Sequence, residues 1–172
     1  MKKILVTVFL GSDSDLPVMA KACEVLEEFN VPYKIIVSSA HRSPNLTPKN
    51  IEKFKNLGTK VIIAGAGLAA HLAGAIAAHF PLPVIGVPLK SGALNGIDSL
   101  YSTVQMPPGI PVATVGIDNA KNAGILAVQI LATSNKVLEK KLVEFKKLLE
   151  DGVRKKSEKL EKIGWKSYSQ NK

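Results

Sequence analysis

The sequence predicts an α/β domain built on a parallel sheet with helices on both of its faces. Three observations support this fold class: short apolar runs recur along the chain, a helical pattern follows each run, and the runs show no polar–apolar alternation. Strands buried on both faces have this continuous apolar character, and strands that alternate with helices are typical of parallel sheets. The chain of 172 residues, 46% hydrophobic and 22% charged, is long enough to bury one substantial core.

Five apolar runs predict the strands. Aliphatic and β-branched residues dominate each run, and a glycine, a proline or a polar turn closes it, as is usual at strand ends. The runs cover residues 3–10, 33–39, 61–64, 84–87 and 112–115.

Capping residues and prolines mark the predicted helices that follow these strands. In the first helix, apolar residues recur at i, i+3 and i+4, and later helices begin at capping residues or stop at proline. Five strand–helix units in residues 1–135 predict a three-layer α/β/α, doubly wound and flavodoxin-like domain. The helices run from the turn at 11–15 to Asn30, from the Thr47–Pro48 cap to about Gly58, over 69–80, from Asp98 or Ser99 to before Pro107, and from Asp118 or Asn119 over 120–132.

Residues 136–172 form a separate feature, an extra C-terminal helix and tail. They hold 12 of the 23 basic and 6 of the 14 acidic residues, so +6 of the net charge of +9 lies here. The charges are interleaved, which is typical of a solvated helix face, and aromatic residues are only 5% of the chain, so we expect no nucleic-acid partner. The helix at 136–163 also carries an apolar stripe that must bury against a neighbouring subunit or against its own domain. The stripe consists of Leu138, Leu142, Phe145, Leu149, Val153 and Leu160.

Cysteine content and hydropathy indicate the cellular setting. Cys23 is the only cysteine, so neither a disulfide framework nor a cysteine-based metal site can form within one chain. The sequence has no apolar stretch long enough to span a membrane and no basic-then-apolar signal pattern. We therefore expect a cytoplasmic protein with no membrane partner.

Loops that follow the first three strands should meet at the carboxyl edge of the sheet, where open α/β folds bind ligands. The first, residues 11–15, offers hydroxyls and helix N-terminal amides to an anion, although Asp13, Ser14 or Asp15 could equally just cap the helix. The second carries His41 beside Arg42. An imidazole exchanges a proton near neutral pH, and a planar guanidinium suits a phosphate or carboxylate.

The third loop, residues 65–71, consists of small residues that let a flat ring approach the backbone, and it ends in His71. His71 could take part in chemistry or simply bond a backbone carbonyl, whereas His79 is better placed to interact with the end of its helix. The long polar segment at 91–102 is typical of a binding or interface loop. The sequence contains no Walker, dinucleotide, nucleophile-triad or metal-ligand pattern, so we expect neither a cofactor nor a metal.

Four motifs occur in order along residues 3–132. They are Gly-Ser-Asp-Ser-Asp at 11–15, Ser-Ala-His-Arg-Ser-Pro at 39–44, Ala-Gly-Ala-Gly-Leu-Ala-Ala-His-Leu at 64–72, and Gly-Ile-Asp-Ser-Leu-Tyr-Ser-Thr-Val-Gln-Met-Pro at 96–107. Together they closely resemble the class I N5-carboxyaminoimidazole ribonucleotide mutases of purine biosynthesis. Two positions differ from the pattern of that family, since Leu68 stands where glycine is usual and Ala73 where proline is usual. Leu68 adds bulk near the expected ring pocket.

The resemblance implies an isomerase that moves a carboxylate from N5 to C4 of aminoimidazole ribonucleotide, without metal, ATP or organic cofactor, in a homo-octamer. It implies His41 as the proton carrier and contacts to the nucleotide from Ser12, Asp15 and Arg42. His71 is a second catalytic candidate. Three alternatives remain: a class II carboxylase that uses CO2 directly, a non-catalytic nucleotide-binding module, and a flavin or dinucleotide protein. The other expected substrate contacts are Ser14, Ser39, Ala40, Gly65, Ala66, Gly67 and Leu72.

Overall fold

The computed structural model describes residues 3–170. The chain forms two compact units, Met1–Leu131 and Ala132–Lys172. In the described part of the first unit, five strands form one sheet in the order β2-β1-β3-β4-β5, and all neighbouring pairs are parallel. The predicted parallel sheet is thus confirmed. Its strands are β1 (Val6–Leu10), β2 (Tyr33–Val37), β3 (Val61–Gly67), β4 (Val84–Leu89) and β5 (Ala113–Thr114).

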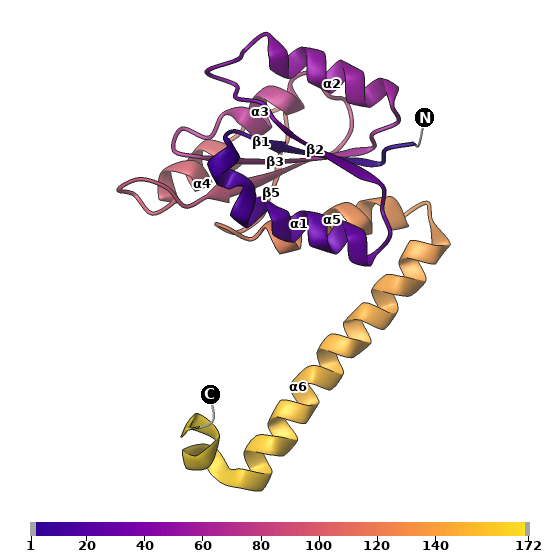
Figure 1. The fold of residues 1–172 in the computed structure, drawn as a ribbon, viewed down its shortest axis with the longest axis vertical. Coiled ribbons are helices and arrows are strands. Elements are labelled where there is room, and N and C mark those ends of the chain that lie inside the picture. Colours follow the sequence, from indigo (N-terminus) through magenta and orange to yellow (C-terminus); the bar gives the residue numbers. More distant parts are fainter. Residues whose placement is uncertain (1–2, 171–172) are drawn as a thin grey trace. The chain divides into compact units, whose positions relative to one another are not determined.

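Helices cover both faces of this sheet, which confirms the three-layer, doubly wound prediction (Figure 1). They are α1 (Leu16–Glu28), α2 (Leu46–Asn56), α3 (Leu72–Ala77), α4 (Ile97–Val104) and α5 (Ala120–Ala132), and a short 3-10 helix, η1 (Asp13–Asp15), precedes α1. On one face, Met19 of α1 fills the space beside Gly65 of β3, and Gly124 of α5 lies against α1. On the other face, which α2, α3 and α4 cover, Thr103 of α4 packs beside Gly86 of β4.

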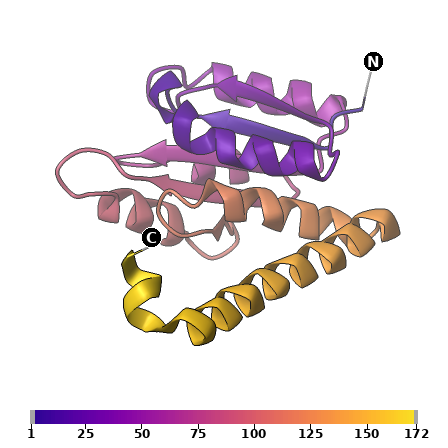
Figure 2. The same ribbon diagram turned by 60° about the horizontal axis from the view of Figure 1, so that its bottom comes forward.

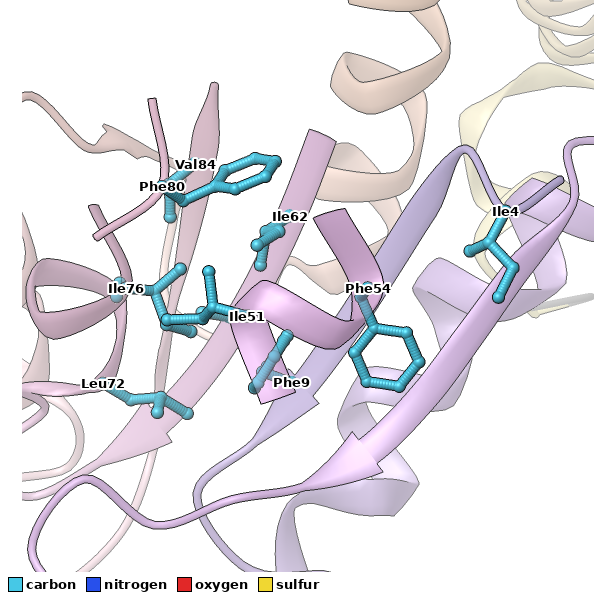
Figure 3. Packing of buried hydrophobic residues seen from close by; sticks show 11 residues of the cluster. Ile4, Phe9, Ile51, Phe54, Ile62, Leu72, Ile76, Phe80 and Val84 are labelled. Carbon is cyan, nitrogen blue, oxygen red and sulfur yellow. The ribbon is translucent and has the colours of Figure 1, made fainter. Parts of the chain in front are cut away.

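A cluster of buried apolar side chains fills the space between the sheet and the helices α2 and α3 (Figure 3). Phe9 of β1 is fully buried there and meets Phe54 of α2 edge to face, with ring centroids 6.2 Å apart and an interplanar angle of 86°. Burying one such side chain contributes about 1.5–3 kcal/mol. The cluster holds the strands in place, and with them the loops that leave their carboxyl ends. Its members are Ile4, Phe9, Ile51, Phe54, Ile62, Ala64, Leu72, Ala73, Ile76, Phe80 and Val84.

The prediction that Thr47 caps the second helix is wrong. α2 begins at Leu46, and Thr47 is buried with its hydroxyl oxygen 2.9 Å from that of Ser38. The backbone N–H of Ser38 in turn donates to the carbonyl of Leu10 at 2.8 Å. Ser38 therefore ties the end of β2 to β1 and to α2, which fixes the start of the loop that follows β2.

The start of α4 also differs from the prediction, which placed a cap at Asp98 or Ser99. The helix begins directly after Gly96, whose φ of 90° lies in the left-handed region. Ser99 donates its hydroxyl hydrogen to a carbonyl of β4 at 2.9 Å, so a tertiary contact has taken the group that could have capped the helix. Asn119, one of the two residues predicted to cap α5, does accept a hydrogen bond from a backbone N–H of its first turn at 3.2 Å.

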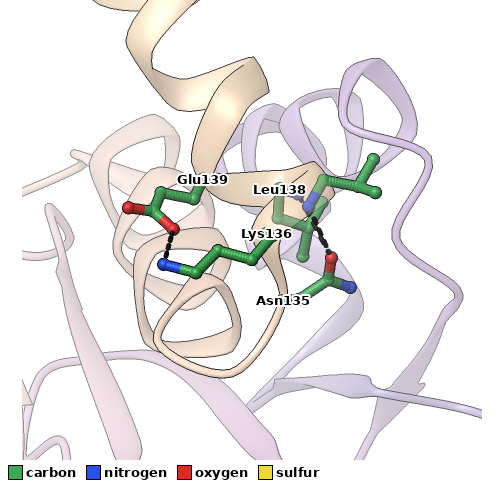
Figure 4. A network of polar contacts seen from close by, with 5 residues as sticks. Asn135, Lys136, Leu138 and Glu139 are labelled. Carbon is green, nitrogen blue, oxygen red and sulfur yellow. Dashed lines mark hydrogen bonds and ion pairs between the residues drawn. The ribbon is translucent and has the colours of Figure 1, made fainter.

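The second unit consists mainly of one long helix, α6 (Lys136–Gln170). Asn135 caps it, since its side-chain oxygen accepts hydrogen bonds from the backbone N–H groups of Val137 at 3.0 Å and Leu138 at 3.3 Å (Figure 4). The helix breaks at Gly164, where φ is 73° and ψ is 156°. The bend is visible near the yellow end in Figure 2. The predicted extent of 136–163 therefore matches the straight part of α6.

The apolar stripe of α6 is only partly buried. Leu138 and Leu142 are buried, whereas Leu149 is 56% and Val153 67% exposed. That a neighbouring subunit covers the exposed part stays a prediction. Within residues 3–170, no helix combines the length and the hydropathy needed to cross a membrane.

Candidate active site

A pocket of about 470 Å³ opens where the chain leaves β1, β2 and β3. The strand order reverses between β1 and β3, so the pocket lies at the topological switch point, the usual ligand site of open α/β sheets. It brings together every predicted site residue except Gly65. Its wall is formed by Gly11, Ser12, Ser14, Asp15, Ser39, Ala40, His41, Arg42, Ala66, Gly67, Leu68, Ala69, His71, Leu72 and Ser91.

The loop after β1 is held by its own carboxylate. Asp15 accepts a hydrogen bond from the backbone N–H of Ser12 at 2.8 Å, and the N–H of Gly11 donates to the carbonyl of Gly65 at 3.0 Å. Burial raises the pKa of the Asp15 carboxyl above its ordinary value, although hydrogen bonds from the Ser12 and Gly11 backbone and the charge of Arg42 oppose this shift. Asp15 thus stabilises its own loop and also lines the pocket, so the two predicted roles are compatible.

Arg42 connects the loop after β2 to the loop after β1. Its Nη2 donates to the carbonyl of Gly11 at 3.0 Å, and its Nε donates to the Ser39 hydroxyl at 3.4 Å. The Ser39 hydroxyl also accepts from the Arg42 backbone N–H at 3.2 Å. A guanidinium carries five N–H donors, more than these two side-chain contacts use. Arg42 is therefore positioned on the pocket wall with capacity to bind an anion.

Two histidines meet across the pocket. His41 Nε2 lies 2.7 Å from His71 Nδ1, and the ring centroids are 4.8 Å apart with an interplanar angle of 67°. One nitrogen must carry the hydrogen while the other accepts it, so this contact cannot form when both rings are protonated. The contact favours a chemical role for His71 over a bond to a backbone carbonyl. His79, by contrast, places Nδ1 2.9 Å from the carbonyl of Ala75, as its position near a helix end predicted.

Small residues form the wall contributed by the loop after β3. Gly67 has no room for a Cβ because the Ser91 hydroxyl occupies that space, and the N–H of Leu68 donates to the same hydroxyl at 3.1 Å. Leu68 itself has a φ of 54°, in the left-handed region that glycine adopts without cost. Through these contacts, Ser91, which follows β4, connects the loop after β4 to the end of β3.

The expectation for Gly65 needs correction. Gly65 is buried on β3 and faces α1, where a Cβ would overlap the side chain of Met19, so it lies behind the pocket wall. Four lining residues were not among the predicted contacts: Gly11, Leu68, Ala69 and Ser91. Ser91 begins the long polar segment that had been recognised as a binding or interface loop, so a signal for it was present. Within residues 3–170, no group of three or more His, Cys, Asp and Glu side chains could hold a metal ion.

This fold and this pocket define a class: an open α/β enzyme whose ligand site combines anion-binding groups with a pair of histidines. The family model for AIR carboxylase matches residues 5–151, and the chain belongs to this family.

Known proteins resemble the chain over nearly its whole length. An N5-carboxyaminoimidazole ribonucleotide mutase from Pyrococcus horikoshii is 54% identical over 167 residues, covering 97% of this chain and 94% of the relative. A phosphoribosylaminoimidazole carboxylase from Candida glabrata is 53% identical across 100% of this chain, which spans only 30% of that longer protein. The crystal structure of Treponema denticola PurE has a TM-score of 0.80 at 28% identity and covers 93% of this chain and 98% of that one.

Proposed function

We propose that this chain is an N5-carboxyaminoimidazole ribonucleotide mutase of de novo purine biosynthesis. Relatives that carry this name are 52–54% identical over nearly their full length. The observation that carries the proposal is one pocket that holds a histidine pair beside Arg42 and Asp15. The substrate is a small ribonucleotide with a 5′-phosphate, a ribose and a carbamate on its imidazole ring.

Arg42 and the loop at 11–15 bind the phosphate. A guanidinium and backbone amides are strong donors to phosphate oxygens, and Arg42 already lies against this loop through Gly11. Asp15 accepts hydrogen bonds from the ribose hydroxyls with the lone pairs that Ser12 leaves available. These contacts orient the ring toward His41.

His41 carries the proton in both steps. The C–N bond of the carbamate breaks, its electron pair returns to N5, and N5 takes a proton from His41. C4 then attacks the released CO2, and neutral His41 removes the C4 proton, which restores the aromatic ring. A group that serves first as acid and then as base must titrate near the working pH, as imidazole does. The contact with His71 supports this role because it orients the His41 ring.

The reaction needs no cofactor because CO2 is both the leaving group and the reagent. The small residues Ala66, Gly67 and Ala69 let the ring lie close to the backbone, so that the bound ring displaces water from this wall. Holding CO2 beside C4 turns an encounter between two molecules into a step within one complex, which supplies much of the acceleration.

A carboxylase that adds CO2 directly to aminoimidazole ribonucleotide is the second candidate, favoured by the carboxylase name of some relatives. The test supplies purified protein with either ribonucleotide, without ATP or metal. The mutase converts the N5-carboxylated substrate and gives no comparable rate with the uncarboxylated ribonucleotide plus bicarbonate. The opposite preference would replace the mutase with the carboxylase.

We also propose a cytoplasmic homo-octamer in which the exposed stripe of α6 packs on a neighbouring subunit. The exposed apolar side chains of α6 support a partner, and the single buried Cys23 suits a reducing compartment. Deleting residues 136–172 should lower the mass of the assembly measured by light scattering. An unchanged octamer would remove α6 from the interface.

A further inference from the structure

Leu68 combines a strained backbone with a poorly buried side chain. Its φ of 54° lies in the left-handed region, which disfavours any residue with a Cβ, yet its side chain is 56% exposed and lines the pocket. Burial therefore offers little compensation for the strain. Strain that packing does not compensate is often located where a residue serves a ligand.

The surrounding structure fixes Leu68 in this conformation. Its backbone N–H donates to the Ser91 hydroxyl at 3.1 Å, and its carbonyl accepts from the N–H of Ala70 at 2.8 Å. Ser91 also fills the space beside Gly67, the residue that directly precedes Leu68 in the chain. The direction of the Leu68 side chain is thus set by the loops after β3 and β4 together.

The side chain of Leu68 reaches across to the loop after β4. A Cβ added to Gly92 would lie 2.9 Å from Leu68 Cδ2, so Gly92 leaves the space that the leucine occupies. Leu68 therefore bridges the loops after β3 and β4 and presents an aliphatic surface to the pocket.

We propose that Leu68 is a retaining residue, whose side chain closes the pocket on the side of Gly92 and slows the escape of released CO2. The inference rests on the proposed mutase reaction, in which the C–N bond has broken and the C4–C bond has not yet formed. At that point CO2 either adds to C4 or leaves, and its departure yields aminoimidazole ribonucleotide instead of the carboxylated product. An aliphatic side chain suits this role because CO2 is uncharged and has no hydrogen-bond donors, so an apolar barrier can confine it without binding it tightly.

The test measures how much of a label at the carbamate carbon is retained in the product. The reaction runs in unlabelled bicarbonate buffer with added carbonic anhydrase, which exchanges any CO2 that escapes, and an enzyme-free blank corrects for spontaneous loss. We expect the wild-type protein to retain the label and both Leu68→Ala and Leu68→Gly to lose it several-fold more often. The matched control is Leu94→Ala, because Leu94 is 61% exposed on the neighbouring loop and does not line the pocket.

The two variants separate the side chain from the backbone. Leu68→Ala keeps the Cβ and its strain, whereas Leu68→Gly removes both, so a loss of label in both variants supports the side chain as the barrier. Leu68→Gly should also be at least as heat-stable as the wild type, which excludes general unfolding as the cause. If both variants retain the label as well as the wild type does, and the wild type isomerises its substrate normally, the role of Leu68 is overturned while the proposed mutase function stands. A wild-type protein that forms no carboxylated product overturns the proposed function and the inference with it.

Discussion

The pocket has two walls that are built in different ways. The polar wall, residues 11–15 and 39–42, is cross-linked by side-chain hydrogen bonds such as Arg42 to the Gly11 carbonyl. The small-residue wall, Ala66, Gly67 and Ala69 with Leu68 between them, is shaped by the left-handed backbone of Leu68 and by the lack of space for a side chain at Gly67. The polar wall thus supplies charge and protons, whereas the small-residue wall supplies shape. Substitutions in the polar wall should therefore change ligand binding or catalysis. Substitutions in the core directly behind the small-residue wall should change the stability of the fold.

The largest effect is expected from His41→Asn, which removes the proton carrier from the polar wall. General acid–base catalysis contributes about 100- to 10,000-fold, and the same residue serves in both proton transfers, so turnover should become undetectable. Affinity for a ribonucleotide, measured by calorimetry, should remain close to that of the wild type. His79→Asn is the matched control because His79 bonds only a helix carbonyl among the contacts that the structure gives it. Full activity of His41→Asn would remove His41 from the mechanism.

Arg42→Ala tests the anchoring function of the same wall. Hydrogen bonds to charged groups contribute about 1.5–3 kcal/mol, so affinity for 5′-phosphorylated ligands should fall about 10- to 100-fold. Affinity for a nucleoside without the phosphate should change little. Arg154→Ala on α6 is the control, because Arg154 is an exposed residue that pairs with Asp151 and Glu158. Equal affinity of Arg42→Ala and wild type for phosphorylated ligands would exclude Arg42 from the phosphate site.

Gly65→Ala tests the rear of the small-residue wall. The added Cβ would overlap the side chain of Met19, which is fully buried and cannot move aside freely, so overpacking should cost about 1–3 kcal/mol. The change should lower Tm while the affinity of the folded protein for ribonucleotide stays the same. Gly116→Ala is the control, since a Cβ there would meet only Asn119 at 3.9 Å. A loss of affinity without a loss of stability would return Gly65 to the binding site.

The two walls also differ in how well the sequence predicted them. The sequence predicted the side chains of the polar wall because their residue types and positions indicate their chemistry: a histidine beside an arginine after a strand, or a carboxylate before a helix. Ser91 and Gly65 were harder, because the role of each depends on which neighbour fills the adjacent space. Thr47 and Ser99 show the same limit, since each looks like a cap in isolation but bonds a distant strand or loop in the fold.

The α/β class and the parallel sheet were predictable because burial on both faces leaves continuous apolar runs. The close approach of His41 and His71 was not, because they lie on loops far apart in the chain and their spacing depends on how both loops fold. The strain at Leu68 was equally hidden, since a leucine gives no sequence signal for a left-handed backbone.

The smallest effect is expected for Asp15→Asn, which separates the structural and ligand-binding roles of the polar wall. Burial raises the pKa of Asp15, with hydrogen bonds from Ser12 and Gly11 and the charge of Arg42 acting in the opposite direction and Asp13 adding to the rise. The folded protein therefore holds this proton more tightly than the unfolded chain does. Stability falls as pH rises from the ordinary aspartate pKa through the raised folded value, and it levels off above that value.

The Asp15→Asn variant lacks this titration, so the Tm of the wild type minus that of the variant should decline across this pH window. Asp151→Asn is the control, because Asp151 is an aspartate on α6 that does not line the pocket. A difference in Tm that rises with pH would mean that the Asp15 carboxylate is stabilised in its charged form by the fold. In that case its hydrogen bonds from the loop backbone would outweigh burial, and Asp15 would be more a structural anchor than an acceptor for the ribose.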